Sequence, residues 1–153
     1  KIVIFSQWTS MLDIVQDALN RKKLKFVRLD GSMSQAQRAK SIRQFNNNDS
    51  CRIILISLKA GGVGLNLTVA NKVILLDPWW NPSTEDQAID RVHRLGQSRA
   101  VDVYRYICSN TVEEKLLALQ DKKRDMSNQA LSSSGDSKAS VKLSMEELRQ
   151  FFL

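Results

Sequence analysis

Residues 53–68 read Ile53-Ile-Leu-Ile-Ser57-Leu-Lys-Ala-Gly-Gly62-Val-Gly-Leu-Asn-Leu-Thr68 and combine two signals of one fold class. The first four residues are continuously apolar, which is typical of a short strand covered on both faces in a parallel sheet. Three glycines follow, and glycines after a parallel strand let backbone N–H groups approach a phosphate closely. The stretch fits neither a GxGxxG fingerprint nor a GxxxxGK[ST] loop. It predicts an α/β protein with a phosphate-binding loop to which Ser57, Lys59 and Asn66 add hydrogen-bond donors.

Other apolar runs of strand length flank this stretch, at residues 2–5, 26–29, 73–76 and 101–107. Helical patterns lie between them: apolar residues recur at helical spacing over residues 11–19, and Ser34 with Gln37 is typical of a capping box. This alternation predicts right-handed βαβ units, hence a parallel sheet with helices on both faces. Ligands on such sheets gather at the loops beyond the carboxyl ends of the strands.

The pattern changes after residue 110, and we expect three short segments beyond the main lobe of residues 1–110. Thr111 and Glu114 fit a second capping box, which predicts a polar helix over residues 111–131. Residues 132–143 are rich in Ser and predict a flexible loop. Residues 144–153 predict a short final helix that packs on the lobe through its apolar side chains.

The composition favours a globular protein with a polyanionic partner. The net charge is +7, and residues 1–109 carry all of the excess, with 16 Lys and Arg against 9 Asp and Glu. Such a basic excess favours nucleic acid or nucleotide phosphate, although a generally solvated basic surface would also explain it. No apolar run approaches the roughly 18 residues of a membrane span, so we expect no membrane partner. Cys51 and Cys108 have no CxxC or His pairing, which favours a reducing compartment and indicates no metal site.

A dense polar cluster occupies residues 87–97, Gln87-Ala-Ile-Asp-Arg91-Val-His-Arg94-Leu-Gly-Gln97. We predict a helix that begins after a cap at Ser83 or Thr84 and presents Arg91 and Arg94 on one face, because they are three residues apart. Two planar guanidinium groups suit a phosphate chain that gains negative charge during phosphoryl transfer. An ordinary pair of surface arginines is the alternative interpretation.

Two adjacent tryptophans lie in the segment Asp77-Pro-Trp-Trp80-Asn-Pro82, which follows the apolar run 73–76. A loop at a strand end exposes residues, so we expect at least one indole to be accessible for stacking or groove insertion. We predict that Trp79 packs on the core and that Trp80 makes the contact. Burial of both in the core is the alternative.

Taken in chain order, these segments resemble the second lobe of the superfamily 2 helicase engine, specifically that of the Swi/Snf-type DNA-dependent ATPases. Ile4-Phe-Ser-Gln7 and Asp30-Gly-Ser32 resemble the entry motifs, residues 57–68 the fifth motif and residues 87–97 the sixth. The segment 77–82 belongs to the Swi/Snf branch, and residues 112–124 resemble its bracing helix. The resemblance covers about residues 1–125.

The amino-acid sequences of three segments are similar to those of one branch of that family. They are Gln7-Trp-Thr-Ser-Met-Leu12, the bracing-helix segment and the final Leu-Arg-Gln-Phe-Phe-Leu. That branch comprises helicase-like transcription factor, its ubiquitin-ligase repair relatives and the RNA polymerase II termination factor.

The resemblance implies a RecA-like lobe in which Arg91 and Arg94 act as arginine fingers on ATP. It implies nucleotide-binding roles for Gln87, Gly64 and Asn66. It implies DNA-binding roles for Ser57, Lys59, Trp80, Gln7 and Gly31. ATP and Mg²⁺ would be bound mainly by the N-terminal RecA-like lobe of the same protein. Double-stranded DNA and chromatin or other DNA-bound proteins would be the partners, in the nucleus.

The sequence contains no Walker A loop and no DExH box, so we expect this chain to be half of an enzyme that remodels protein–DNA complexes and to be inactive alone. A RING ligand array is also absent from it. A nucleic-acid-binding module with no catalytic share is the alternative. A small-molecule α/β enzyme is disfavoured, because no nucleophile and base, and no paired acid and base carboxylates, can be recognised in the strand-end loops.

Overall fold

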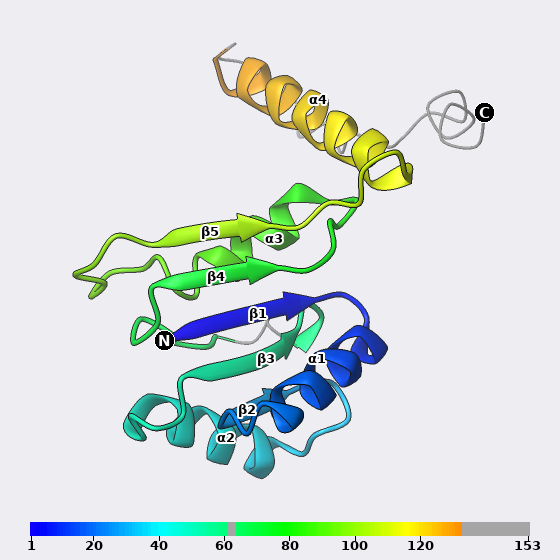
Figure 1. Ribbon diagram of the computed structural model, residues 1–153. Coiled ribbons are helices and arrows are strands. Elements are labelled where there is room, and N and C mark those ends of the chain that lie inside the picture. The colour runs from blue at the N-terminus through cyan, green and yellow to red at the C-terminus, as the bar shows by residue number, and fades with distance from the viewer. Residues whose placement is uncertain (61–63, 133–153) are drawn as a thin grey trace.

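The apolar runs of the sequence form the strands of one parallel sheet, shown in Figure 1. The computed structural model describes residues 1–60 and 64–132. In chain order the elements are β1 (Ile2–Ser6), α1 (Thr9–Arg21), β2 (Phe26–Leu29), α2 (Gln35–Asn47), β3 (Ile53–Ser57), β4 (Lys72–Leu75), α3 (Pro82–Ile89), β5 (Asp102–Arg105) and α4 (Val112–Ser132). The strand order is β2-β3-β1-β4-β5, and all four pairings are parallel. The predicted α/β class and parallel sheet are confirmed.

Helices cover both faces of the sheet, as the continuous apolar strands predicted. On one face Phe5 and Ile56, both fully buried, pack with Phe45 of α2 and Ala88 of α3. On the other face the core is smaller and centres on Leu12 of α1. Because β1 and β3 are central and paired from Ile2 with Ile53 to Ser6 with Ser57, their carboxyl ends meet at one edge.

The start of α2 agrees with the prediction, whereas those of α3 and α4 differ from it. α2 begins with the predicted capping box, in which Ser34 Oγ accepts from Gln37 N. α3, however, is capped by Asn81, whose side chain accepts from Ser83 N, and Pro82 occupies its first turn. The cap predicted at Ser83 or Thr84 was wrong, because Asn-Pro is the stronger start signal.

At the start of α4, Thr111 Oγ1 accepts from Glu113 N at 3.2 Å. The carboxylate of Glu113, not that of Glu114, reaches back to the preceding loop, where it accepts from Cys108 N. The second capping box therefore differs in detail, while the predicted helix is present. The predicted loop 132–143 and final helix 144–153 lie outside the described residues, apart from Ser132 at the end of α4.

The edge strand β5 is shorter and more exposed than expected. It spans four residues instead of the predicted 101–107, and Val103 and Tyr104 are both exposed. Only β4 pairs with it among the described strands, so its outer side has no strand partner there. No helix in the described part of the chain is long and apolar enough to span a membrane.

A buried polar cluster joins α3, β5 and α4. The carboxylate of Glu85, fully buried, accepts from Trp79 N at 2.7 Å and from Gln120 Nε2 at 2.7 Å. Its second oxygen lies 2.8 Å from Arg105 Nη2. Gln120 Nε2 also donates to the carbonyl oxygen of Trp79. Glu85 thereby fastens the bracing helix α4 to the loop that carries both adjacent tryptophans.

Candidate functional site

Four of the five predicted DNA-binding residues line one hollow at the carboxyl edge of the sheet. Gln7 follows β1, Gly31 follows β2, and Ser57 and Lys59 lie at and after the end of β3. The hollow has a volume of about 310 Å³, and its described lining also includes Trp8, Thr9 and Trp79. The position agrees with the rule that ligand loops follow the carboxyl ends of parallel strands.

The β1 side of the hollow is fixed by Asp77, which follows β4. Its carboxylate accepts from Gln7 N at 2.8 Å and contacts Ser6 Oγ. Ser6 Oγ also accepts from Trp8 N at 3.0 Å. Burial raises the pKa of the Asp77 carboxyl above its ordinary value, although the hydrogen bonds from Ser6 and Gln7 oppose this. Asp77 therefore joins the loop after β4 to the end of β1 at Ser6 and Gln7.

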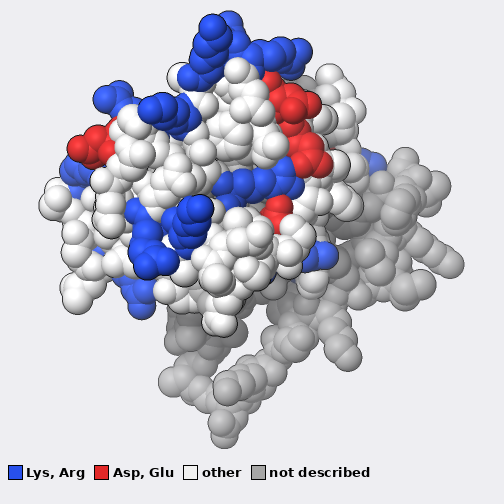
Figure 2. Space-filling model, turned by 90° about the horizontal axis from the view of Figure 1, so that it is seen from below, with Lys and Arg blue, Asp and Glu red and all other residues white. Residues whose placement is uncertain are grey.

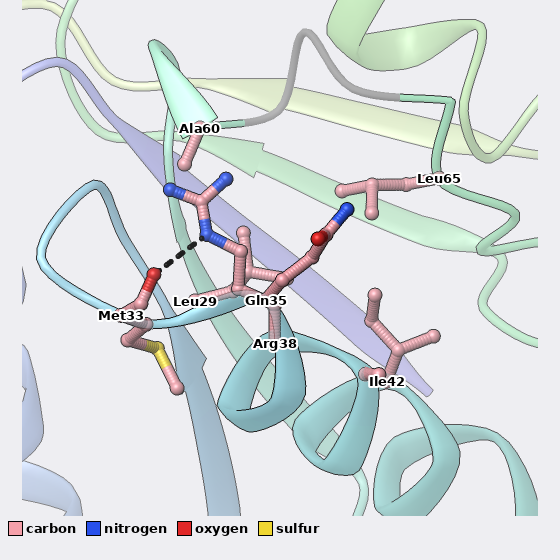
Figure 3. A pocket seen from close by; sticks show the side chains of 8 residues that line it. Leu29, Met33, Gln35, Arg38, Ile42, Ala60 and Leu65 are labelled. Carbon is pink, nitrogen blue, oxygen red and sulfur yellow. Dashed lines mark hydrogen bonds between the residues drawn. The ribbon is translucent and has the colours of Figure 1, made fainter.

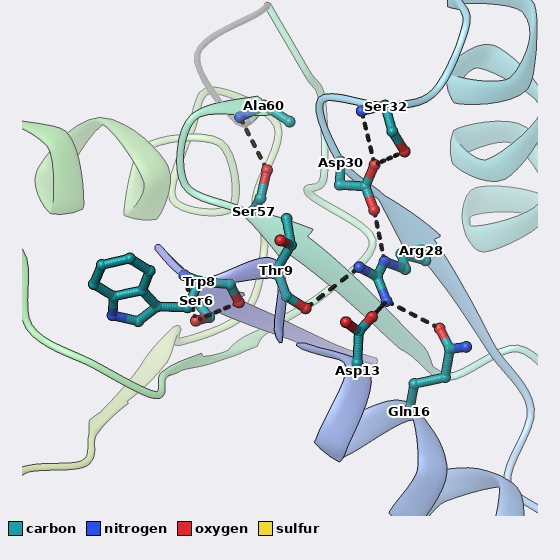
Figure 4. Close-up of polar contacts among 10 residues, drawn as sticks. All are labelled: Ser6, Trp8, Thr9, Asp13, Gln16, Arg28, Asp30, Ser32, Ser57 and Ala60. Carbon is teal, nitrogen blue, oxygen red and sulfur yellow. Dashed lines mark hydrogen bonds and ion pairs between the residues drawn. The ribbon is translucent and has the colours of Figure 1, made fainter. Parts of the chain in front are cut away.

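The β2 side is fixed by Asp30 in the same way (Figure 4). Asp30 accepts from Ser32 N at 2.9 Å and from Ser32 Oγ at 2.6 Å, and it forms an ion pair with Arg28 Nε at 2.7 Å. Arg28 also pairs with Asp13 of α1. Burial alone would raise the pKa of Asp30, but the bonds from Ser32 and Arg28 outweigh it and hold that pKa below its ordinary value. This network sets the path of the loop at Gly31.

The lining residues differ in how much they expose. Ser57 is buried, and its Oγ accepts from Ala60 N at 3.3 Å, which closes the turn that carries Lys59. Lys59 and Gly31 are exposed. A Cβ added at Gly31 would meet nothing within 4 Å, so packing does not require glycine there. Lys59 is thus an exposed positive charge on a turn that the Ser57 hydrogen bond closes.

The adjacent tryptophans divide as predicted, one packed and one exposed. Trp79 is partly buried against the main core. Trp80 is 50% exposed, and its ring lies 6.1 Å from that of Trp79. Lys123 of α4 places Nζ 5.1 Å from the centre of the Trp80 ring, a cation–π geometry. The exposed indole is therefore held from behind by the bracing helix.

Arg91 and Arg94 do not share a helical face, so that part of the prediction was wrong. α3 ends at Ile89, and the next residues form turns: Arg91 N donates to Ala88 O at 3.2 Å and Val92 N to Ile89 O at 2.9 Å. The chain leaves the helix because Val92 is fully buried in the core and because Arg91 O accepts from Leu67 N at 2.9 Å. No helix stop signal precedes Gly96 in this segment.

The turn that holds the two arginines is fastened by Gln97. Its Nε2 lies within hydrogen-bond distance of Ala70 O at 2.7 Å, Thr68 O at 3.0 Å and Val92 O at 3.2 Å. Gly96 has φ +100°, a left-handed conformation that glycine adopts without strain. Arg94 is exposed, whereas Arg91 is partly buried and its Nε has no hydrogen-bond partner among the described residues.

The predicted nucleotide-binding residues lie beside this turn only in part. Asn66 adjoins Leu67, which bonds to Arg91 O, and its Oδ1 accepts from Thr68 Oγ1 at 2.9 Å. Gln87 is exposed on α3, and Gly64 is exposed after the undescribed residues 61–63. Neither is joined to the arginine turn by a hydrogen bond that the structure records.

The arginine turn is not at the carboxyl edge where we expected all ligand loops. It bonds to the segment 67–70, and the next residue, Asn71, donates to Lys1 O just before β1. The turn therefore lies toward the amino ends of the central strands. The predicted residues form two groups, a hollow at one edge and an arginine turn near the other.

Sequence reasoning missed Trp8 and Thr9 as lining residues of the hollow. Trp8 is the N-cap residue of α1, but no side chain caps the helix there. Ser, Thr, Asp or Asn is usual at that position, so an aromatic residue is a local departure that could have been noticed.

A second hollow of about 360 Å³ lies beside α2 (Figure 3). Its described lining is mainly apolar and includes Leu29, Met33, Ile42, Ala60 and Leu65. Arg38 Nε donates to Met33 O at 3.2 Å across it. Residues 61–63 directly follow Ala60 and are not described, so we assign this hollow no function.

Lys and Arg outnumber Asp and Glu on the surface in Figure 2, which views the molecule from the side of α1, α2 and β2. α2 contributes three basic residues and no acidic one: Arg38, Lys40 and Arg43. The basic excess of the sequence therefore extends beyond the hollow. No group of three or more metal-ligating side chains occurs among the described residues.

Comparison with known proteins identifies the chain. The family model of the helicase conserved C-terminal domain matches residues 1–96. Helicase-like transcription factor CHR28 of Arabidopsis thaliana is 46% identical over 153 residues, which are 100% of this chain and 16% of that protein. DNA repair protein rad8 of Schizosaccharomyces pombe is 47% identical over 152 residues, 99% of this chain and 13% of that protein. The chain spans less than a fifth of these relatives.

The fold has a solved counterpart. The crystal structure of the C-terminal part of the Fun30 ATPase domain matches with a TM-score of 0.79 and 34% identity, over 99% of this chain and 45% of that chain. The family match, the relatives and this structural neighbour agree with the family resemblance of the sequence. The chain belongs to the helicase conserved C-terminal domain family, as a RecA-like C-terminal lobe of the Swi/Snf type.

Proposed function

We propose that this chain is the second ATPase lobe of a double-strand DNA translocase that remodels protein–DNA complexes in the nucleus. Its hollow at the carboxyl edge contacts the DNA backbone, and its arginine turn completes an ATP site on the N-terminal lobe of the same protein. Opening and closing of the two lobes during ATP turnover moves the pair along the duplex. Relatives named as DNA repair proteins and transcription factors support the nuclear setting.

The observation that carries the DNA contact is the convergence of residues from three loops in one hollow. Gln7, Gly31, Ser57 and Lys59 are far apart in sequence but line the same surface. They combine an exposed ammonium group with amide and hydroxyl groups, which suits phosphate and sugar contacts without base specificity. Trp80 is adjacent to Trp79, which lines the hollow. Its indole is half-exposed and can enter a DNA groove.

The arginine turn supports the proposed catalytic share. The buried Nε of Arg91 has no partner within residues 1–60 and 64–132 and is a donor for which an incoming phosphate oxygen is a suitable acceptor. The three contacts of Gln97 hold the turn in place before any ligand arrives. Gln87, Asn66 and Gly64 would line the nucleotide side of the lobe. Mg²⁺ bound by the N-terminal lobe would neutralise the phosphates of ATP. Arg91 and Arg94 would stabilise the charge of the transferring phosphoryl group.

Triplex displacement by the full-length protein tests this function. A translocase strips a third strand from duplex DNA with ATP, and not with a non-hydrolysable analogue. We expect the 153-residue chain alone to displace nothing and to hydrolyse no ATP. DNA-stimulated hydrolysis by the isolated chain would contradict its assignment as half of an enzyme. Normal duplex binding by the full-length protein without any ATP turnover would favour a binding module instead.

A further inference from the structure

One aromatic side chain in the hollow has no part in the proposed backbone contacts. Trp8 is 59% exposed and lines the hollow with Lys59 and Ser57. Figure 4 shows its indole pointing away from the Arg28 cluster. An exposed indole at a helix N-cap contributes neither to the core nor to capping. Exposed aromatics beside a basic group are the stacking platforms of proteins that bind unpaired bases.

The charges around the hollow favour an uncharged group inside it and a phosphate only at the rim. Asp30, which is ion-paired with Arg28, directly precedes Gly31, and Asp77 accepts from Gln7 N, so two buried carboxyl groups adjoin lining residues. Lys59, by contrast, is an exposed cation. A phosphate deep in the hollow would approach the two acidic groups, whereas a nucleobase carries no charge there.

The size of the hollow agrees with a single planar group. Its volume of about 310 Å³ is at the lower limit for ligand pockets, which span about 300–1,000 Å³. Thr9 supplies a hydroxyl group that is able to bond to a base edge.

We propose that this hollow binds an unpaired nucleobase, stacked on Trp8, with the adjoining phosphate at Lys59. The protein therefore binds DNA with an unpaired nucleotide more tightly than uninterrupted duplex. This inference rests on the proposed function, because it assumes that the hollow faces DNA.

The test uses the full-length protein and two labelled duplexes that differ at one position. One carries an unpaired 2-aminopurine opposite an abasic site, and the other carries the same base paired with thymine. We expect about tenfold tighter binding of the unpaired probe, since stacking of one base on an aromatic ring has about this effect. Trp8→Ala should remove the preference and leave duplex affinity within about twofold. Trp8→Phe should keep most of it.

Leu24→Ala is the matched control, because Leu24 is 49% exposed and lies before β2, at the opposite end of the strands. It should leave both affinities unchanged. The fluorescence of 2-aminopurine gives a second readout with the unaltered protein, since stacking on Trp8 quenches it.

The outcomes separate the inference from the function on which it rests. Equal affinity for both probes, or an unquenched base in the bound complex, would overturn the inference and leave the proposed translocase intact. Binding of neither probe would contradict the proposed function as well. A preference that survives in Trp8→Ala would also overturn the assignment to this hollow.

Discussion

Removal of the Glu85 carboxylate should destabilise the lobe strongly. Glu85 is fully buried, accepts hydrogen bonds from Trp79 N and Gln120 Nε2, and forms an ion pair with Arg105 Nη2. In Glu85→Ala the guanidinium group of Arg105, only 27% exposed, loses its partner, and two further donors lose an acceptor. Breaking a buried ion pair from one side costs about 3–5 kcal/mol. This is a large share of the roughly 5–15 kcal/mol that stabilises a domain.

Glu85→Gln separates the charge from the hydrogen bonds. The amide keeps the volume of the side chain and one acceptor, but its NH₂ group must face one of the donors. We expect a loss of about 1–3 kcal/mol, intermediate between wild type and Glu85→Ala. Asp49→Asn, at an exposed carboxylate between α2 and β3, is the control and should stay within about 0.5 kcal/mol.

Urea unfolding of the 153-residue chain, followed by circular dichroism and by tryptophan fluorescence, measures these free energies. Fluorescence is informative because the main chain of Trp79 bonds to both Glu85 and Gln120. If Glu85→Ala unfolded at the same urea concentration as wild type, the cluster would contribute nothing and the proposed fastening of α4 would be wrong.

The remaining predictions concern the hollow and the loop of adjacent tryptophans. Asp30 has a lowered pKa in the folded protein, so its contribution to stability is present above the unfolded value near pH 4 and is lost as the pH falls below it. Asp30→Asn should therefore lower the melting temperature more at pH 7 than at pH 2.5, and an equal loss at both pH values would contradict this. Lys59→Ala should weaken DNA binding equally for all sequences and reduce its salt dependence, as titrations at several salt concentrations will reveal. Trp79→Ala should cost about 2 kcal/mol in a thermal melt, because its ring is only partly buried. Trp80→Ala should melt normally, yet translocate less per ATP hydrolysed in the two-lobe protein, and a reversed pattern would exchange the two roles.

The sheet and its helices could be predicted from the sequence because burial has a simple signature. Residues 53–56 of β3 are continuously apolar since both faces of the strand are covered, and the capping box at Ser34 depends only on neighbouring residues. The edge strand β5 was predicted too long, because exposed Tyr104 and Tyr106 look like core residues in sequence. Exposure at a sheet edge depends on strand order, which no local pattern contains.

Part of the candidate site could be predicted because the sequence shows which residues lie at strand ends. Gln7, Gly31, Ser57 and Lys59 each follow a strand, and the rule for parallel sheets brings such residues to one edge. The end of α3 could not be predicted, because tertiary bonds from Leu67 N and the burial of Val92 stop the helix. Trp8 was missed because an aromatic residue at a helix N-cap departs from the usual Ser, Thr, Asp or Asn but does not by itself indicate a ligand.

We propose that Arg91 and Arg94 supply positive charge to an ATP site that this lobe shares with another lobe. The most direct measurement is the turnover of ATP at saturating duplex DNA by the full-length protein with Arg91→Ala or Arg94→Ala. We expect a fall of about 10³-fold or more with little change in DNA affinity, and poor rescue by lysine, which cannot form the planar bidentate contact. Arg21→Ala, at the exposed end of α1, should change neither quantity. Near-normal turnover in both alanine variants would show that the pair are ordinary surface arginines.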